Sequence, residues 1–106
     1  MKKQYIMIDE DGNYFYYSDK EMTIPHRENG PAVEYADGDR VWYLDGKLHR
    51  ENGPAVEFGD ENRVWCIHGQ CHRLDGPVVE FDVGIEWWIK GKTYTEEEFI
   101  KAVKME

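Results

Sequence analysis

Histidine and arginine stand side by side three times in this chain, and their chemistry suits a binding site. The pairs recur every 23 residues, at His26-Arg27, His49-Arg50 and His72-Arg73. An arginine can hold a phosphate or carboxylate through two parallel hydrogen bonds, and nearby tryptophans can stack a base. One interpretation is therefore an anion or nucleotide site made of Arg27, Arg50, Arg73, His49 and His72.

The same residues have a structural interpretation, which the sequence favours. Carboxylates that can neutralise the arginines follow close behind them, at Glu28, Glu34, Glu51, Glu57 and Glu80. Equivalent imidazoles two strands apart would be separated by roughly 10 Å, which is too far for one metal ion. We therefore expect each imidazole to bond a turn carbonyl and each guanidinium to pair with a carboxylate.

One cluster has the ligand chemistry of zinc, namely Cys66, His68, Cys71 and His72. The other repeats fill both cysteine positions with ordinary side chains, so structural thiols are favoured and neither a metal nor a cofactor is predicted. Two cysteines make no disulfide framework, which indicates reduced thiols in the cytoplasm.

No catalytic constellation is recognisable. Ser18 is the only serine, and no serine or threonine stands near a suitable histidine and aspartate. The glycine pattern of a phosphate-binding loop is absent too. The chain is therefore predicted not to be an enzyme.

Composition and charge limit the kinds of partner that the chain is expected to bind. The 106 residues carry a net charge of −9, which disfavours direct nucleic-acid binding. No apolar run approaches the roughly 20 residues of a membrane helix, and no signal peptide is expected. A protein partner, without a membrane, is the expectation.

The elements that would position these residues are short hairpins. A fixed period of 23 residues is typical of stacked repeats, and Asp-Gly pairs such as Asp11-Gly12, Asp37-Gly38 and Asp45-Gly46 indicate turns. We predict a mainly β protein: a single-layer antiparallel β-meander of four hairpin repeats with a short C-terminal capping helix. The single domain, 1–106, would contain a degenerate repeat at 4–25, repeats at 26–48, 49–71 and 72–93, and the helix at 95–104.

Finer predictions concern turns, rows and the helix start. Asp37-Gly38 is predicted to form a type I′ turn, between strands at 31–35 and 40–44. Thr95 and Glu98 form a capping box. Four rows are expected to be buried: Val33/Val56/Val79, Tyr35/Phe58/Phe81, Trp42/Trp65/Trp87 and Leu44/Ile67/Ile89.

The unit resembles the MORN repeat family. The shared pattern is a hairpin with an Asp-Gly tip, an aromatic strand and then Gly-x-x-His, here at residues 46–49 and 69–72. Arg50 and Arg73 stand where the typical unit has glycine, so the chain looks like the variant H-R-x-(N/D)-G-P-A repeat of small phage, bacterial and large-virus proteins. The resemblance implies a scaffold for protein interaction and no enzyme.

The first functional hypothesis is thus a non-enzymatic protein-binding module, phage- or prokaryote-encoded, that inhibits a host defence enzyme. Its exposed face is predicted to consist of Tyr16, Tyr43, Trp88, Glu34, Glu57 and Glu80. The alternatives are a DNA mimic, in which Asp39, Asp60 and Asp82 interleave with the glutamates, and a nucleotide-sequestering protein. The uncapped N-terminal edge at 4–8 leaves a homodimer open, by edge pairing or helix exchange.

Overall fold

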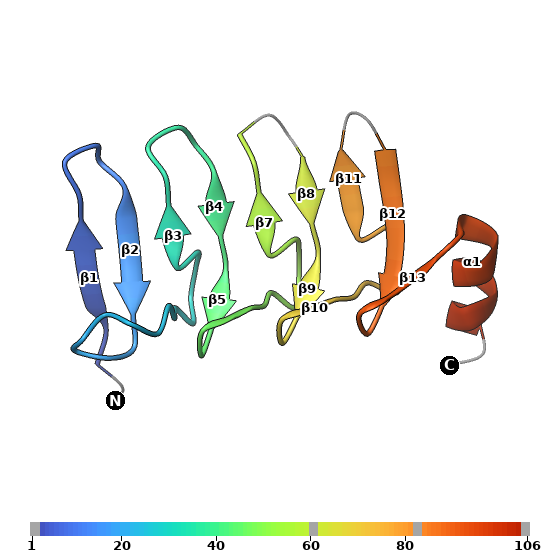
Figure 1. Ribbon diagram of the computed structural model, residues 1–106, viewed down its shortest axis with the longest axis horizontal. Coiled ribbons are helices and arrows are strands. Elements are labelled where there is room, and N and C mark those ends of the chain that lie inside the picture. The colour runs from blue at the N-terminus through green and yellow to red at the C-terminus, as the bar shows by residue number, and fades with distance from the viewer. Residues whose placement is uncertain (1–2, 60–61, 82–83, 105–106) are drawn as a thin grey trace.

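The computed structural model describes residues 3–59, 62–81 and 84–104. One large antiparallel sheet of hairpins makes up most of the molecule, and a single helix follows it (Figure 1). Its strands are β1 (Tyr5–Ile8), β2 (Tyr14–Tyr17), β3 (Val33–Glu34), β4 (Arg40–Val41), β7 (Val56–Glu57), β8 (Arg63–Val64), β11 (Val79–Phe81), β12 (Gly84–Ile89) and β13 (Lys92–Tyr94).

These strands lie side by side in the order of the chain, so the sheet is a meander. Two small ladders continue it at the end opposite the hairpin tips: β5 (Tyr43–Leu44) pairs with β6 (Lys47–Leu48), and β9 (Cys66–Ile67) pairs with β10 (Gln70–Cys71). The molecule measures 45 × 30 × 18 Å, and its two termini lie at opposite ends. The predicted mainly β class, with hairpins and a C-terminal helix, is confirmed.

The strand predicted at 40–44 is interrupted at Trp42. The Trp42 amide donates to the Ala55 carbonyl at 2.7 Å, and its carbonyl accepts from the His49 amide at 3.1 Å. Trp42 therefore bonds the following loop instead of continuing its own hairpin. The strand predicted at 31–35 is likewise reduced to Val33–Glu34.

The hairpin tip at Asp37-Gly38 is not a type I′ turn. That turn needs positive φ at both central residues, and only Gly38 has it, with φ of 100°. The Gly38 amide donates to the Tyr35 carbonyl, and the Tyr35 amide donates to the Asp39 carbonyl. This arrangement is a type I turn followed by a glycine bulge, so the predicted turn type was wrong.

Type I′ geometry occurs at the other end of the hairpins. Both central residues have positive φ at three turns, Asp45-Gly46, His68-Gly69 and Lys90-Gly91. Because a β-carbon is strained there, Asp45, His68 and Lys90 need a further stabilising contact. The repeated histidines provide that contact, as shown below.

Side chains alternate between the two faces of the sheet. The valine face carries a row of register partners, Val33, Val41, Val56, Val64 and Val79. Val33 and Val79 are buried as predicted, whereas Val56 is half-buried. The most deeply buried residues are Ala32, Ala55 and Val78, each with 0% exposure.

Three predicted rows are less buried than expected. Tyr35 and Phe58 are 41% and 37% exposed, because they lie just past β3 and β7, at the hairpin tips; the side chain of Phe81 is outside the described residues. The remaining rows are half-buried at Trp42, Trp65, Trp87, Leu44 and Ile67, and only Ile89 is fully buried.

The helix α1 (Glu96–Lys104) closes the C-terminal end of the sheet. Thr95 Oγ1 accepts the Glu98 amide at 3.1 Å, and Glu98 Oε1 accepts the Thr95 amide at 2.9 Å, which is the predicted capping box. Phe99, 4% exposed, packs on Trp87 with ring centroids 4.9 Å apart. No helix in the described part of the chain has the length and apolar character to cross a membrane.

Candidate functional site: a ladder of arginines and two grooves

Each repeated arginine has its guanidinium group over an aromatic ring of the preceding hairpin. The guanidinium carbons of Arg27, Arg50 and Arg73 lie 4.0, 3.8 and 3.7 Å from the ring centroids of Tyr16, Trp42 and Trp65. A planar guanidinium is attracted to the electron-rich face of such a ring. We call Arg27, Arg50 and Arg73 the arginine ladder, and the side of the sheet that carries it the arginine face.

The ladder is neutralised within the chain. Each Nη1 donates to the carbonyl of the proline four residues later, at 3.0 to 3.2 Å. It also donates to the glutamate seven residues later, at 3.4 Å for Glu34 and 2.9 Å for Glu57 and Glu80. In the third copy Arg73 Nε also donates to Asp75, which lowers the pKa of that carboxyl. The predicted pairing of arginine with carboxylate is present at all three positions.

The glycine of each His-Arg loop gives its arginine room. A β-carbon built on Gly30, Gly53 or Gly76 would lie 3.1, 2.9 or 2.7 Å from the Cζ of the arginine three residues before it. Such contacts are tighter than side chains normally make. A β-carbon at these positions would therefore displace the guanidinium from its place over the ring, most strongly at Gly76.

The repeated histidines hold the type I′ turns. Nδ1 of His26, His49 and His72 accepts the backbone amide of Asp45, His68 and Lys90, at 2.9, 3.0 and 2.9 Å. The expected bond to a turn carbonyl was wrong, because a neutral imidazole nitrogen accepts and the turn presents an N–H here. The imidazoles thus stabilise the strained first residue of each turn.

Cys66 and Cys71 face each other across the β9–β10 ladder as free thiols. Burial, with a smaller contribution from Cys71, raises the pKa of Cys66 to about 12, so its thiol is protonated at neutral pH. Within residues 3–59, 62–81 and 84–104, no three His, Cys, Asp or Glu side chains are placed to hold a metal ion.

The glutamate row on the arginine face is interleaved with cations. The sheet register alternates along one line as Glu34, Arg40, Glu57, Arg63 and Glu80. Opposite charges therefore face each other across each strand pair, which stabilises the sheet. Of the second acidic row, Asp39 accepts the Gly59 amide at 2.7 Å, while Asp60 and Asp82 lie outside the described residues.

The residues predicted to form one partner-binding face lie on two sides of the sheet. Tyr16 and the glutamates Glu34, Glu57 and Glu80 belong to the arginine face, where Arg27 covers Tyr16. Trp88 follows Trp87 in β12 and so points to the valine face, where its indole donates to Glu86 at 2.9 Å. Tyr43 occupies the position equivalent to Trp88, since their carbonyls accept the amides of Arg27 and Arg73.

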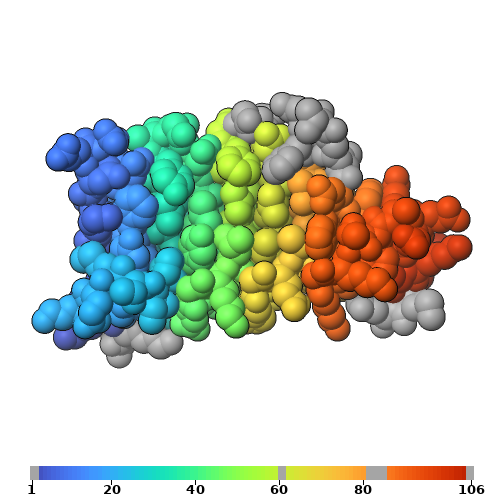
Figure 2. Space-filling view, viewed as in Figure 1, coloured from blue at the N-terminus to red at the C-terminus, as the bar shows by residue number. Residues whose placement is uncertain are grey.

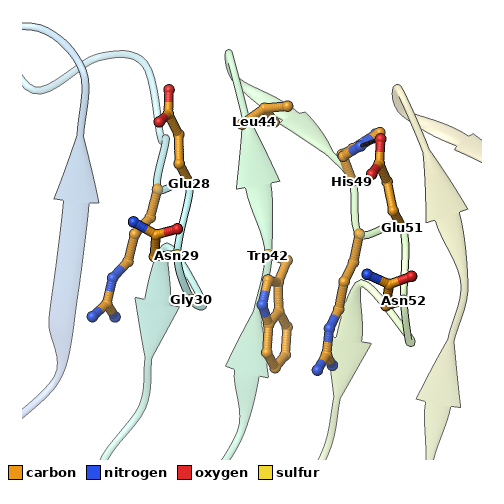
Figure 3. A pocket seen from close by; sticks show the side chains of 10 residues that line it. Glu28, Asn29, Gly30, Trp42, Leu44, His49, Glu51 and Asn52 are labelled. Carbon is orange, nitrogen blue, oxygen red and sulfur yellow. Dashed lines mark ion pairs between the residues drawn. The ribbon is translucent and has the colours of Figure 1, made fainter. Parts of the chain in front are cut away.

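Two adjoining grooves lie between successive His-Arg loops. Groove 1, of about 600 Å³, has Trp42 and Leu44 as its floor, and its walls are the loops that begin at His26 and His49. Figure 3 shows Trp42 and Leu44 between the side chains of Glu28 and Asn29 on one side and of Glu51 and Asn52 on the other.

Groove 2, of about 690 Å³, repeats this design one hairpin further along. Its floor is Trp65 and Ile67, and its walls are the loops that begin at His49 and His72. Leu74 and Asp75 replace the glutamate and asparagine of the earlier loops on its second wall. Groove 2 therefore has as many carboxylates as groove 1 but is more apolar.

Sequence reasoning did not find the groove residues Asn29, Asn52, Leu44, Ile67 and Leu74. Their signal was present, since they recur with the same spacing as the histidines and arginines that were singled out. What was missing was the register, which decides that these loops and the tryptophans share one face. Comparisons with family models, curated proteins and solved structures found no match to this chain.

Proposed function

We propose that this chain is a four-unit repeat protein of period 23 that works as a non-enzymatic protein-binding module, with grooves 1 and 2 as its binding surface. One observation carries the proposal: the same kind of groove, with an aromatic floor and loop walls, is built twice in adjacent hairpins. Tandem pockets of one design suit a partner that presents side chains at a regular spacing.

Charge favours a basic side chain in groove 1. Glu28 and Glu51 stand on opposite walls, and their side chains are 59% and 78% exposed. The arginines beside them are already bonded to Glu34 and Glu57. A lysine or arginine of the partner would therefore meet two exposed carboxylates, which lie 3.6 and 3.7 Å from imidazole nitrogens, above the apolar floor of Trp42 and Leu44.

Groove 2 favours a side chain that is apolar for most of its length. Leu74, 39% exposed, replaces one wall carboxylate, and Arg73 neutralises Asp75 at 2.7 Å. Contact with Leu74, Ile67 and Trp65 would remove apolar surface of the partner from water. A leucine or a phenylalanine is the expected occupant.

The spacing of the grooves favours an extended segment. Equivalent residues of adjacent hairpins are two strands apart, which is roughly 9.6 Å. A polyproline II segment rises about 3.1 Å per residue, so every third side chain recurs on one face after about 9.3 Å. The proposed ligand is thus a segment with a basic residue and an apolar residue three positions apart.

The DNA mimic and the nucleotide-sequestering protein are less well supported, because the charges of the sheet are interleaved and the arginines are already paired. A DNA mimic needs unneutralised carboxylates, and a phosphate would have to displace a glutamate from each arginine. In agreement with the resemblance to variant MORN repeats, the partner we propose is a host enzyme that carries such a basic segment, inhibited when the segment is held.

Fluorescence anisotropy with labelled peptides tests the proposal. A peptide containing Lys-Pro-Pro-Leu should bind, and binding should weaken as salt rises, since the charges are exposed. The same peptide with glutamate in place of lysine should bind at least about tenfold more weakly, a difference of about 1.4 kcal/mol.

Matched variants locate the site. Glu28→Gln with Glu51→Gln should abolish the preference for lysine, while Glu10→Gln with Glu21→Gln, at exposed positions of the first hairpin and its following loop, should keep it. Equal affinity for the lysine and glutamate peptides, or loss of binding in the control variant as well, would contradict the groove as the binding surface.

A further inference from the structure

The two ends of the sheet are protected very differently. At the C-terminal end α1 packs against β12 and β13 and covers that end of the sheet (Figure 2). Phe99 of this helix is buried on Trp87. At the N-terminal end β1 is the last strand of the sheet order. It contains neither a charge nor a proline, the usual means by which an edge strand avoids pairing.

The unpaired backbone groups of β1 can be identified from its neighbour. The Tyr16 amide donates to the Ala32 carbonyl and the Tyr16 carbonyl accepts from the His26 amide, so both groups of Tyr16 are directed away from β1. Ile6 is the register partner of Tyr16, and its own N–H and C=O therefore point away from β2. By alternation those of Gln4 and Ile8 also point to the open edge.

The side chains of this strand are unusually apolar for an exposed edge. Ile6, Met7 and Ile8 are 50%, 38% and 56% exposed. A cation precedes the strand at Lys3 and an anion follows it at Asp9, whose carboxyl pKa is lowered by its hydrogen bonds with Asn13. The segment from Lys3 to Asp9 is thus apolar in the middle and oppositely charged at its ends.

This sequence is complementary to itself when reversed. In an antiparallel pair of two copies centred on Ile6, Ile6 faces Ile6 of the second copy, Gln4 faces Ile8, and Lys3 faces Asp9. Pairing centred on Ile6 also satisfies the hydrogen bonds. It sets Gln4, Ile6 and Ile8, whose N–H and C=O groups point to the open edge, opposite the same three residues of the second copy. A shift by one residue would lose the hydrogen bonds, because each residue with free peptide groups would then face one whose peptide groups are bonded to β2.

We infer that the protein is a homodimer in which the β1 strands of two copies pair antiparallel about a two-fold axis at Ile6. The contact is isologous, so it closes after two copies, and α1 prevents growth at the other end. The sheet continues through the axis, so the arginine faces of both copies point to the same side. This inference does not depend on what the grooves bind.

Sedimentation velocity over a range of concentrations tests the dimer. The wild-type chain should sediment as a dimer, and Ile6→Lys, which would place two ammonium groups opposite each other, should weaken association by at least about tenfold. Ile100→Lys changes an isoleucine of α1 that is 44% exposed and should leave the dimer intact. A monomeric wild type, or dissociation by Ile100→Lys alone, would overturn the inference, the latter in favour of contacts through the helix.

Cross-linking tests the register in a chain that keeps its fold. Ile6→Cys, in a Cys71→Ser background, should be joined by a short bis-maleimide, since a hydrogen-bonded antiparallel pair has α-carbons about 5.5 Å apart. Ile8→Cys lies on the same face of the same strand, but the two copies of residue 8 would be about 13 Å apart along the strands, so it should not be joined. Equal cross-linking of the two variants, or none in Ile6→Cys, would refute this pairing.

Discussion

The tryptophan that recurs in successive hairpins is covered by one kind of group in the inner hairpins and by another in the C-terminal hairpin. Trp42 and Trp65 are covered by guanidinium groups of the following loops, whereas Trp87 is covered by the phenyl ring of Phe99. The arginine cover depends on a carboxylate and a carbonyl further along the chain, so it needs another hairpin after it. The phenyl cover needs only a short helix, which explains how the sheet can end there.

The largest effect should come from removing the phenyl cover. Phe99→Ala would delete a side chain that is 4% exposed and should lower the free energy of unfolding by about 3 kcal/mol. Urea unfolding followed by tryptophan fluorescence measures this change. Ile100→Ala, next to it but exposed, should cost under about 1 kcal/mol; similar costs for the two would show that α1 does not depend on its contact with Trp87.

Removing one arginine cover should have a smaller effect. Arg50→Ala loses the stack on Trp42 and the bonds to Pro54 and Glu57 in a half-exposed place, for which we expect about 2 kcal/mol. Arg50→Lys should lower the free energy of unfolding by less than Arg50→Ala does, but should not restore the wild-type value, because an ammonium lacks the planar, forked donors of a guanidinium. The control is Arg40→Ala, an exposed arginine of the same face that stands opposite Glu34 and Glu57; an equal loss there would mean that charge pairing, not stacking, is what matters.

The glycines should report how tightly each arginine is held. Gly76→Ala should lower the free energy of unfolding by about 1 to 2 kcal/mol and Gly30→Ala by less. The added β-carbon would lie 2.7 Å from the guanidinium carbon in the first case and 3.1 Å in the second. In an Arg73→Ala background the cost of Gly76→Ala should largely disappear, and a double-mutant cycle measures that coupling. Additive effects would contradict the proposed contact.

The smallest effect should be the pH dependence of the stability that the capping box gives to the start of α1. The bonds between Glu98 and Thr95 lower the pKa of Glu98 below its ordinary value of 4.5. The unfolded chain thus binds this proton more readily, so the stabilisation is present above pH 4.5 and is lost as the pH falls through the lowered pKa. Thermal melts between pH 3 and about pH 6 should show it in the wild type and not in Glu98→Gln; parallel pH profiles would argue against it.

Local chemistry made several elements predictable. The capping box and the apolar spacing after it predicted α1 within one residue of its start, and the Asp-Gly pairs located hairpin turns. Burial was less predictable. Tyr35 and Phe58 have the composition of core residues, yet their position at the hairpin tips leaves them exposed.

The sequence by itself determined that the chain is mainly β, that hairpins follow one another and that a helix comes last. The reason is that turn residues, a helix cap and alternation act over a few positions. Only the tertiary structure decided that Arg50 covers Trp42, that His49 holds the amide of His68, and that the loops between them frame grooves. Those contacts depend on strand register and on which face each side chain takes, and a repeat in the sequence leaves both undetermined.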